Sequence, residues 1–235
     1  MKKQISNYFD KTINFNIITR YLHKRKYHIT KSILKEMTLD KEINILDIGC
    51  GTASMYEHLC ELNINFNYIG LEPDKILYDE ALNKYNTQCN FKILNNVIEE
   101  NFQLINNSDI ILAMDVLEHM PYNIRNILIE EICNFQDKTL LINVPNEVGP
   151  IIAIKNLGSY LMGYQRYTEY TIMETLNASL YRLDKITHHT IAHKGFDWRT
   201  LDYSLRFYFK DKVKIISFIN FFPKFLSPSI YFKCN

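Results

Sequence analysis

The sequence of 235 residues contains few of the residues that break or cross-link chains. Its 7 glycines and 6 prolines are too few for a long disordered tract. Its 5 cysteines are odd in number and form no C-x-x-C pair, which argues against a disulfide framework or a zinc ribbon. No apolar run approaches the roughly 18 residues of a membrane span, and the N-terminus lacks the apolar core of a secretory signal. We therefore expect one globular domain in the cytoplasm.

Charge is distributed unevenly along the chain, although the formal net charge is only +1. Residues 1–35 carry nine Lys and Arg against one Asp, a net charge of +8. Residues 36–150 carry six against nineteen acidic residues, and residues 151–235 carry twelve against six, which gives −13 and +6. If the two basic ends meet over one face, that face attracts an anion. The alternative is that these residues only solvate helices.

Strand and helix signals alternate along the middle of the chain. Short apolar runs predict strands at residues 43–48, 67–71, 91–94, 109–115 and 139–144. Apolar residues at helical spacing lie between these runs, for example over 75–85 and 124–135. This alternation predicts a doubly wound α/β fold, in which helices cover both faces of a parallel sheet. Residues 146–190 interrupt the alternation with one or two helices, and a helix and two strands follow.

The first predicted strand ends in D-I-G-C-G-T, which begins at Asp47. Gly49 and Gly51 can adopt positive φ and let the backbone pass close to a ligand. The dinucleotide fingerprint needs a third glycine at position 54, where a serine stands, and Asp47 would repel a pyrophosphate. Glu72 ends the second strand, where such folds place an acid that binds ribose hydroxyls. A ribose and a cationic group together indicate S-adenosylmethionine.

These motifs, with DIILAMDVLEHMP at residues 109–121, resemble the class I S-adenosylmethionine-dependent methyltransferases. The resemblance covers residues 40–145 and extends loosely to the C-terminus. It implies a Rossmann-like, mostly parallel sheet of seven strands whose last strand, at 230–233, is antiparallel. It also implies a single domain over 1–235, with an N-terminal helical lid at 1–38, a cofactor-binding core at 40–145, a helical insertion at 146–190 and a C-terminal part at 191–235.

The resemblance further implies which residues bind the cofactor. The glycine turn would line the methionine part, Glu72 would bind the ribose, and Met114 would lie next to the sulfonium unless it is a plain core residue. An asparagine at 95 or 96 stands where the family has an aspartate near the adenine amino group. The predicted cofactor-binding residues are Asp47, Gly49, Cys50, Gly51, Glu72, Pro73, Asn95, Asn96, Val97, Met114 and Asp115.

The segment after the fourth strand offers two catalytic interpretations. V-L-E-H, which ends at His119, is found in many small-molecule O-methyltransferases of this class, and His119 has a pKa suited to a general base. D-x-x-E-H together with the later HKGFDWR also resembles the methyltransferases that modify the 3′-terminal 2′-hydroxyl of small RNAs and hold a metal. Here an Asp replaces the first Glu of that motif, and Gly195 is inserted. The predicted ligands for Mg²⁺, Mn²⁺ or Zn²⁺ are Asp115, Glu118, His119 and His193.

The sequence therefore predicts an enzyme that methylates an oxygen of a small anionic metabolite or sugar. An RNA 2′-O-methyltransferase is the alternative. A binding module without activity is a third hypothesis, against which the intact Glu118–His119 pair argues. The basic segment 18–31 would clamp an anionic substrate or would simply be a solvated helix. His188 and His189 are expected to lie in a polar loop.

Overall fold

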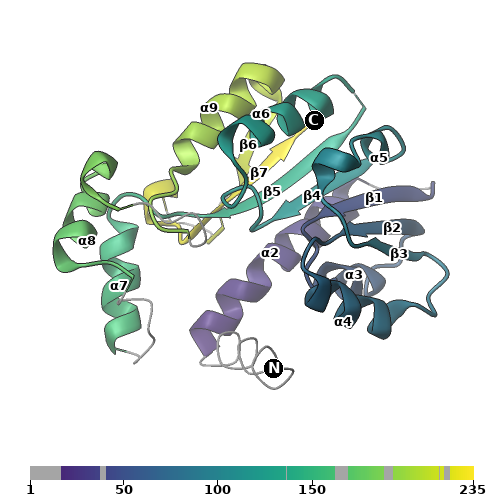
Figure 1. Ribbon diagram of the computed structural model, residues 1–235, viewed down its shortest axis with the longest axis horizontal. Coiled ribbons are helices and arrows are strands. Elements are labelled where there is room, and N and C mark those ends of the chain that lie inside the picture. The colour runs from purple at the N-terminus through teal and green to yellow at the C-terminus, as the bar shows by residue number, and fades with distance from the viewer. Residues whose placement is uncertain are drawn as a thin grey trace.

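The computed structural model describes residues 17–37, 41–135, 137–161, 169–187, 193–216, 218–219 and 223–235. Within these ranges seven strands form one sheet in the order β3-β2-β1-β4-β5-β7-β6 (Figure 1). The strands are β1 (Ile43–Ile48), β2 (Phe66–Leu71), β3 (Phe91–Leu94), β4 (Ile110–Met114), β5 (Thr139–Pro145), β6 (Val213–Ile216) and β7 (Ser229–Cys234). β7 runs antiparallel between β5 and β6, whereas β3, β2, β1, β4 and β5 are parallel. The predicted fold class is confirmed.

Helices cover both faces of this sheet. They are α2 (Ile17–Glu36), α3 (Ser54–Cys60), α4 (Lys75–Tyr85), α5 (Gln103–Asn106), α6 (Tyr122–Cys133), α7 (Ile151–Leu161), α8 (Ile172–Ser179) and α9 (Trp198–Phe209). Buried residues of α2, α3 and α4 share one core cluster, while those of α5, α6 and α9 share the other. Short 3₁₀ turns lie at residues 98–100, 183–185, 210–212 and 224–226.

The strands read as continuous apolar runs because both of their faces are buried. In β1, Ile45 packs into the cluster with α2 and α3, whereas its neighbour Leu46 packs into the cluster with α6 and α9. In β4, Leu112 likewise packs into the cluster with α2 and α3, and its neighbour Ile111 packs into the cluster with α6 and α9. Successive side chains of a strand point to opposite faces, so a sheet covered twice needs apolar residues at every position.

Helix α2 brings the basic N-terminal segment onto the sheet. Ile29, Ile33 and Leu34 of this helix are buried in the core. The Thr30 hydroxyl lies 2.7 Å from the Tyr231 hydroxyl of β7 and is hydrogen-bonded to it. Packing thus fixes the helix against a strand that lies far from it in sequence.

The structure adds detail to the predicted elements. β1, β3 and α4 have the predicted bounds, and β4 is one residue shorter at each end. Pro145, expected to stop the fifth strand at Val144, is instead its last residue and pairs with Ser229 of β7. A proline is tolerated at this position because only its carbonyl can join the ladder. The 3₁₀ turn at 98–100 and helix α5 are short and were not predicted.

Helices α7 and α8 pack together at one side of the sheet, at the left of Figure 1. They occupy the stretch that interrupts the strand–helix alternation. None of the helices in the described ranges combines the length and hydropathy needed to cross a bilayer.

Candidate functional site

The glycine turn after β1 has the backbone that its sequence predicts. Gly49 has φ of 64° and Gly51 has φ of 58°, a left-handed region that favours glycine. A Cβ atom on Gly49 would lie 2.5 Å from Cγ2 of Val116, so this glycine lets the turn approach the segment after β4. A Cβ atom on Gly51 would have no atom within 4 Å, so the turn is open on this side.

Glu72, directly after β2, is fixed against this turn. Its Oε2 accepts a hydrogen bond of 2.7 Å from the Gly51 N–H, and its Oε1 accepts one of 2.9 Å from the Asp74 N–H. Burial raises the pKa of Glu72, and the two backbone hydrogen bonds oppose that rise. The carboxylate therefore has a single orientation at the carboxyl ends of two neighbouring strands.

Asp47, the acid of the D-I-G-C-G-T motif, is buried below the turn. Its Oδ2 accepts a hydrogen bond of 2.7 Å from the Tyr68 hydroxyl. Burial raises the pKa of Asp47 to about 7, although the Tyr68 hydrogen bond and the Lys26 ammonium lower it. Cys50 lies between the glycines, close enough to Gly70 that a Cβ there would meet its Sγ at 2.6 Å.

The predicted adenine-side residues brace the loops that follow β2 and β3. The Asn95 amide donates to the carbonyl oxygens of Glu72 and Pro73 at 2.8 and 3.0 Å. Asn96 Oδ1 accepts a hydrogen bond of 2.8 Å from the Val97 N–H. Asn95 therefore joins the loop after β3 to the end of β2, beside Glu72.

Asp115 follows β4 in a left-handed conformation, with φ of 60°. Its carboxylate accepts a hydrogen bond of 2.6 Å from Lys26 Nζ of α2 and another from the Asn143 amide of β5. Burial acts to raise the pKa of Asp115, but Lys26 and the Asn143 hydrogen bond outweigh it and lower the pKa. Met114, one residue earlier, is buried among the core side chains on the α2 side of the sheet.

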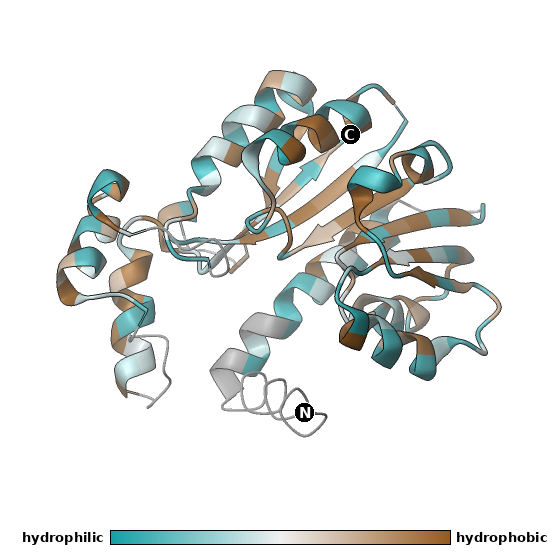
Figure 2. Cartoon of the chain, in the orientation of Figure 1, coloured by the Kyte–Doolittle hydropathy of each residue, from teal (hydrophilic) through white to brown (hydrophobic). Residues whose placement is uncertain are grey.

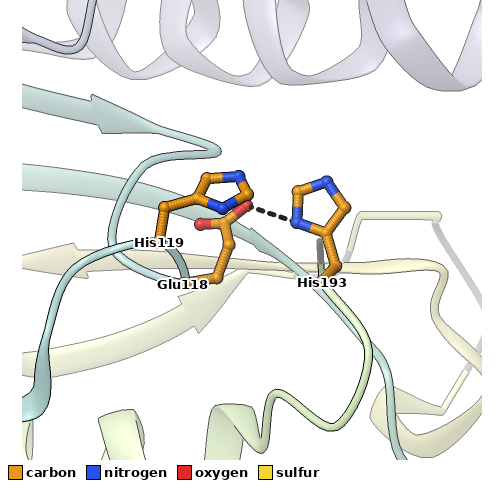
Figure 3. A group of neighbouring side chains, drawn as sticks. All are labelled: Glu118, His119 and His193. Atoms are coloured by element: carbon orange, nitrogen blue, oxygen red, sulfur yellow. Dashed lines mark ion pairs between the residues drawn. The ribbon is translucent and has the colours of Figure 1, made fainter. Parts of the chain in front are cut away.

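Glu118, His119 and His193 form a compact group beside this aspartate (Figure 3). The first two belong to the turn after β4, and His193 comes from the segment that precedes α9. One potential ligand atom from each of the three lies within 4.8 Å of the other two. Asp115, also predicted as a ligand, is not in the group, and its carboxylate is engaged by Lys26 and Asn143.

The Glu118 carboxylate is fully buried, and its oxygens lack well-aligned hydrogen bonds. Its Oε1 lies 3.3 Å from His193 Nδ1, yet neither atom makes an aligned hydrogen bond, and Oε2 also lacks one. Burial raises the pKa of Glu118, and the neighbouring His193 acts against that rise. A buried carboxylate whose oxygens lack aligned hydrogen bonds is costly, so two imidazoles and this carboxylate are a donor set that fits a divalent cation.

The two imidazoles of this group have opposite pKa shifts. Burial acts to lower the pKa of His193, but the Glu118 carboxylate 3.3 Å away outweighs it and raises the pKa. Burial and the charge of His193 lower the pKa of His119. The ring centroids of the two histidines are 4.7 Å apart. The lowered pKa of His119 favours its neutral form, which has a free electron pair for a cation or a proton.

The insertion holds the segment that carries His193. Lys194 is buried, and its ammonium donates hydrogen bonds of 2.9 Å to Glu174 Oε1 of α8 and to Thr187 Oγ1. The Gly195 N–H donates to the Tyr170 hydroxyl at 3.3 Å. These contacts fix the backbone on the C-terminal side of His193. His188 and His189 lie outside the described residues.

Sequence patterns did not identify several residues that shape the site. Lys26 lies in the basic segment 18–31 and Lys194 in the HKGFDWR motif, but only long-range contacts reveal their acidic partners. Asn143 did carry a signal, because it is a polar residue within the apolar run of β5.

Comparison with known proteins agrees with this geometry. Residues 46–131 match the family described as "Methyltransferase domain". Among solved structures, the methyltransferase domain of bacterial CtHen1 aligns with a TM-score of 0.63 and 13% identity, over 91% of this chain and 99% of that one. The plantazolicin methyltransferase BpumL, solved with S-adenosylhomocysteine (SAH), aligns with a TM-score of 0.59 and 15% identity, over 100% and 90%.

Magnesium protoporphyrin IX methyltransferase from Synechocystis PCC 6803, also solved with SAH, aligns with a TM-score of 0.54 and 15% identity, over 99% and 98%. A search of curated proteins gave no match. The family match and the shared fold confirm the predicted resemblance: residues 46–131 match a methyltransferase domain, and the chain has the fold of S-adenosylmethionine-dependent methyltransferases. The predicted enzyme class, a methyltransferase with S-adenosylmethionine as its cofactor, agrees with this family match and this fold.

Proposed function

We propose that this chain methylates a hydroxyl oxygen, and that Glu118, His119 and His193 hold a divalent cation that helps to bind this hydroxyl. The observation that carries the proposal is the buried Glu118 carboxylate, which faces two imidazoles while both of its oxygens lack hydrogen bonds. Imidazole ligands suit Mn²⁺ or Zn²⁺, whereas Mg²⁺ prefers oxygen ligands. When bound, such an ion supplies Lewis-acid polarisation of a hydroxyl group.

In this proposal the cofactor binds at the carboxyl ends of β1 and β2. The open side of Gly51 gives it room, and Glu72, already held by two backbone amides, accepts hydrogen bonds from the ribose hydroxyls. Asp47 and Asp115 supply negative charge that suits the ammonium and sulfonium groups. The remaining predicted cofactor-binding residues, Cys50, Pro73, Asn95, Asn96, Val97 and Met114, lie on the turns and strand ends around this position.

The rest of the catalysis is positioning by the protein. The acceptor oxygen has to lie in line with the sulfonium, between the end of β4 and the Glu118 group. The lowered pKa of His119 favours the neutral imidazole, which can accept the hydroxyl proton if it does not bind the cation. Both roles require His119 at the acceptor side of the cofactor.

The acceptor that we favour is the 2′-hydroxyl at the 3′ end of an RNA strand. The D-x-x-E-H and HKGFDWR motifs resemble those of enzymes that modify this group and hold a metal. Glu118, His119 and His193 are the residues that these two motifs contribute to the group. This observation favours RNA over the first prediction from the sequence.

A small anionic metabolite or sugar is the second candidate. The Lys26 ammonium, beside Asp115, could bind a single anionic group of such an acceptor. Similar structures include methyltransferases of plantazolicin and of magnesium protoporphyrin IX, so this fold also accommodates acceptors other than RNA.

Metal binding tests the proposal directly. Protein stripped with a chelator should bind one equivalent of Mn²⁺ or Zn²⁺ in calorimetry, and Glu118→Ala or His193→Ala should abolish that binding. His58→Ala, on α3 and outside the group, is the matched control and should bind the ion normally. Unchanged ion binding in His193→Ala would contradict the proposed site.

Methyl transfer from labelled S-adenosylmethionine distinguishes the acceptors. A short RNA should be labelled, whereas the same RNA with a 2′-deoxy residue at its 3′ end should not. RNA affinity should fall with salt with a log–log slope of several units, while a small acceptor should give a slope of about one or two. Equal labelling of the two RNAs would exclude the terminal 2′-hydroxyl as the acceptor.

A further inference from the structure

Arg125 is a charged residue on the buried side of α6. The other buried residues of this helix are Leu128, Ile129 and Ile132. The four recur every three or four residues and therefore lie on one stripe, which in a surface helix is apolar. Hydrophobic and hydrophilic residues both occur along α6 in Figure 2. Only 5% of Arg125 is exposed, so a guanidinium stands where the helical pattern predicts an apolar side chain.

This guanidinium has no acidic partner. Its Nε is buried without a hydrogen bond, and none of the ion pairs among the described residues includes Arg125. The other buried basic side chains in the described part of the chain do have partners: Lys194 donates to Glu174, and Lys138 donates to the Asn106 carbonyl oxygen. An arginine stays protonated when it is buried, and an uncompensated buried charge is costly. The arrangement therefore indicates a position for an anion.

Two aromatic rings hold the guanidinium beside the Glu118 group. Its Cζ lies 5.2 Å from the ring centroid of Tyr122 and 5.7 Å from that of Phe196. Tyr122 begins α6, directly after the turn that carries Glu118, and the Phe196 N–H donates to the His193 carbonyl oxygen at 3.1 Å. Burial lowers the pKa of Arg125, and the charges of Tyr122 and Glu118 oppose this lowering. The cation thus lies between the two segments that carry the candidate metal ligands.

The beginning of α6 also favours an anion. Long side chains of a helix point back toward its N-terminus, and the contact with Tyr122 shows that Arg125 does so. None of the residues in the first turn is acidic, and Pro121 at the N-cap offers no side-chain hydrogen bond. The N–H groups of a helix N-terminus attract negative charge. Tyr122 is 59% exposed, so the guanidinium lies directly beneath a surface residue.

We propose that Arg125 binds an anionic group of the methyl acceptor, a phosphate or a carboxylate, beside the candidate metal group. The inference rests on the proposed function, in which that group holds the acceptor hydroxyl. A guanidinium binds such an oxyanion through two parallel hydrogen bonds. Lys26 suits this task less well, because it already pairs with Asp115 at 2.6 Å. For an RNA acceptor, the anion is the phosphate that precedes the terminal ribose.

Fluorescence anisotropy with a short labelled RNA, in the presence of S-adenosylhomocysteine, tests the proposal. Arg125→Met should weaken RNA binding about 10- to 100-fold and lower the log–log salt slope by about one unit, because one phosphate contact is lost. Arg125→Lys keeps the charge and should restore the slope and part of the affinity. Arg206→Met is the matched control and should change neither, since Arg206 is exposed on α9 and pairs with Asp202.

A change in the RNA identifies the phosphate. When a neutral methylphosphonate replaces the last phosphodiester, the wild-type chain should bind as weakly as Arg125→Met binds the unmodified RNA. The two changes together should cost no more than either alone, because they remove the same contact. Circular dichroism and thermal unfolding establish that the variants fold. Unchanged RNA affinity and salt slope in a folded Arg125→Met chain would make Arg125 a packing residue and overturn the proposal.

A wild-type chain that binds no RNA would contradict the RNA acceptor, and inorganic phosphate then tests Arg125 separately. In ¹⁵N-labelled protein, phosphate should shift one arginine Nε–H resonance, and Arg125→Lys should lack that resonance. This shift would assign the site to a small anionic acceptor, and its absence would overturn the proposal. Mn²⁺ binding is measured on the same samples. A wild-type chain that binds no Mn²⁺ would contradict the proposed metal site alone.

Discussion

At the residue scale, Gly49 and Gly51 of the turn after β1 are needed for different reasons. Both have positive φ, but only Gly49 lies against another side chain, that of Val116. The local sequence D-I-G-C-G-T predicts the backbone conformation of the turn. The contact with Val116 follows only from the folded structure, because the two residues lie on turns after different strands.

We expect Gly49→Ala to cost about 3 kcal/mol of unfolding free energy and Gly51→Ala about 1 kcal/mol, since only the first combines positive φ with a clash. Urea denaturation measures both. Adding Val116→Ala to Gly49→Ala should recover about 1 kcal/mol relative to additivity, because the clash disappears. Equal costs for the two glycines, without coupling to Val116, would show that the clash is unimportant.

The Lys26–Asp115 pair makes a second residue-scale prediction. Lys26→Met should cost about 2 kcal/mol at pH 7, because it leaves a largely buried carboxylate without its cation. The pKa of Asp115 is lowered in the folded protein, so the stability it contributes is present above its unfolded pKa of about 3.9 and is lost as pH falls further. In Lys26→Met the ammonium group is gone, so it no longer lowers the pKa of Asp115.

The difference in stability between wild type and Lys26→Met should therefore shrink below about pH 4. Chemical denaturation at pH 7 and pH 3.5 measures it. Asp115→Asn, which removes the charge, should cancel most of the effect of Lys26→Met in the double variant. A pH-independent difference would mean that Lys26 contributes packing rather than charge.

At the element scale, the insertion supports the site from a distance. Glu174 of α8 accepts a hydrogen bond from Lys194, the neighbour of His193. Several hydrogen bonds, from Thr187, Thr171 and Lys194, lower the pKa of Glu174 below its usual range, so it stays ionised. Helix α8 thus helps to position His193, the candidate metal ligand, through the ion pair between Glu174 and Lys194.

Lys194→Met should weaken Mn²⁺ binding by about 10- to 100-fold, because His193 loses the support that orients it. Affinity for S-adenosylmethionine should change little, since Lys194 lies apart from the glycine turn. Lys185→Met, at an exposed position, is the matched control. Calorimetry with each ligand separates the two effects, and an unaltered Mn²⁺ affinity would show that His193 does not depend on this ion pair.

At the scale of the whole molecule, the uneven charge of the sequence has a spatial counterpart. Lys26 from the basic N-terminal part pairs with Asp115, and His193 from the basic C-terminal part lies beside Glu118. Both acids belong to the acidic middle of the chain. One residue from each basic part thus lies near the end of β4, beside an acidic residue of the middle part.

The sequence by itself determined the strands, the glycine turn and the D-x-x-E-H turn after β4. These features depend on local periodicity and backbone preference, which neighbouring residues encode. A match of the motifs to a known family was enough to predict the number of strands and the antiparallel β7, whereas the order of the strands came from the structure. His119 and Glu118 could be singled out because they are adjacent in the chain.

Only the tertiary structure decided which distant residues meet. It brought Lys26 to Asp115 across 89 positions of the chain, a contact that no motif predicted. It also placed His193 beside Glu118, 75 positions away, which the sequence predicted only through the resemblance. The reason is physical: side-chain contacts between remote segments depend on how helices and strands cross and pack, and no local pattern encodes that arrangement.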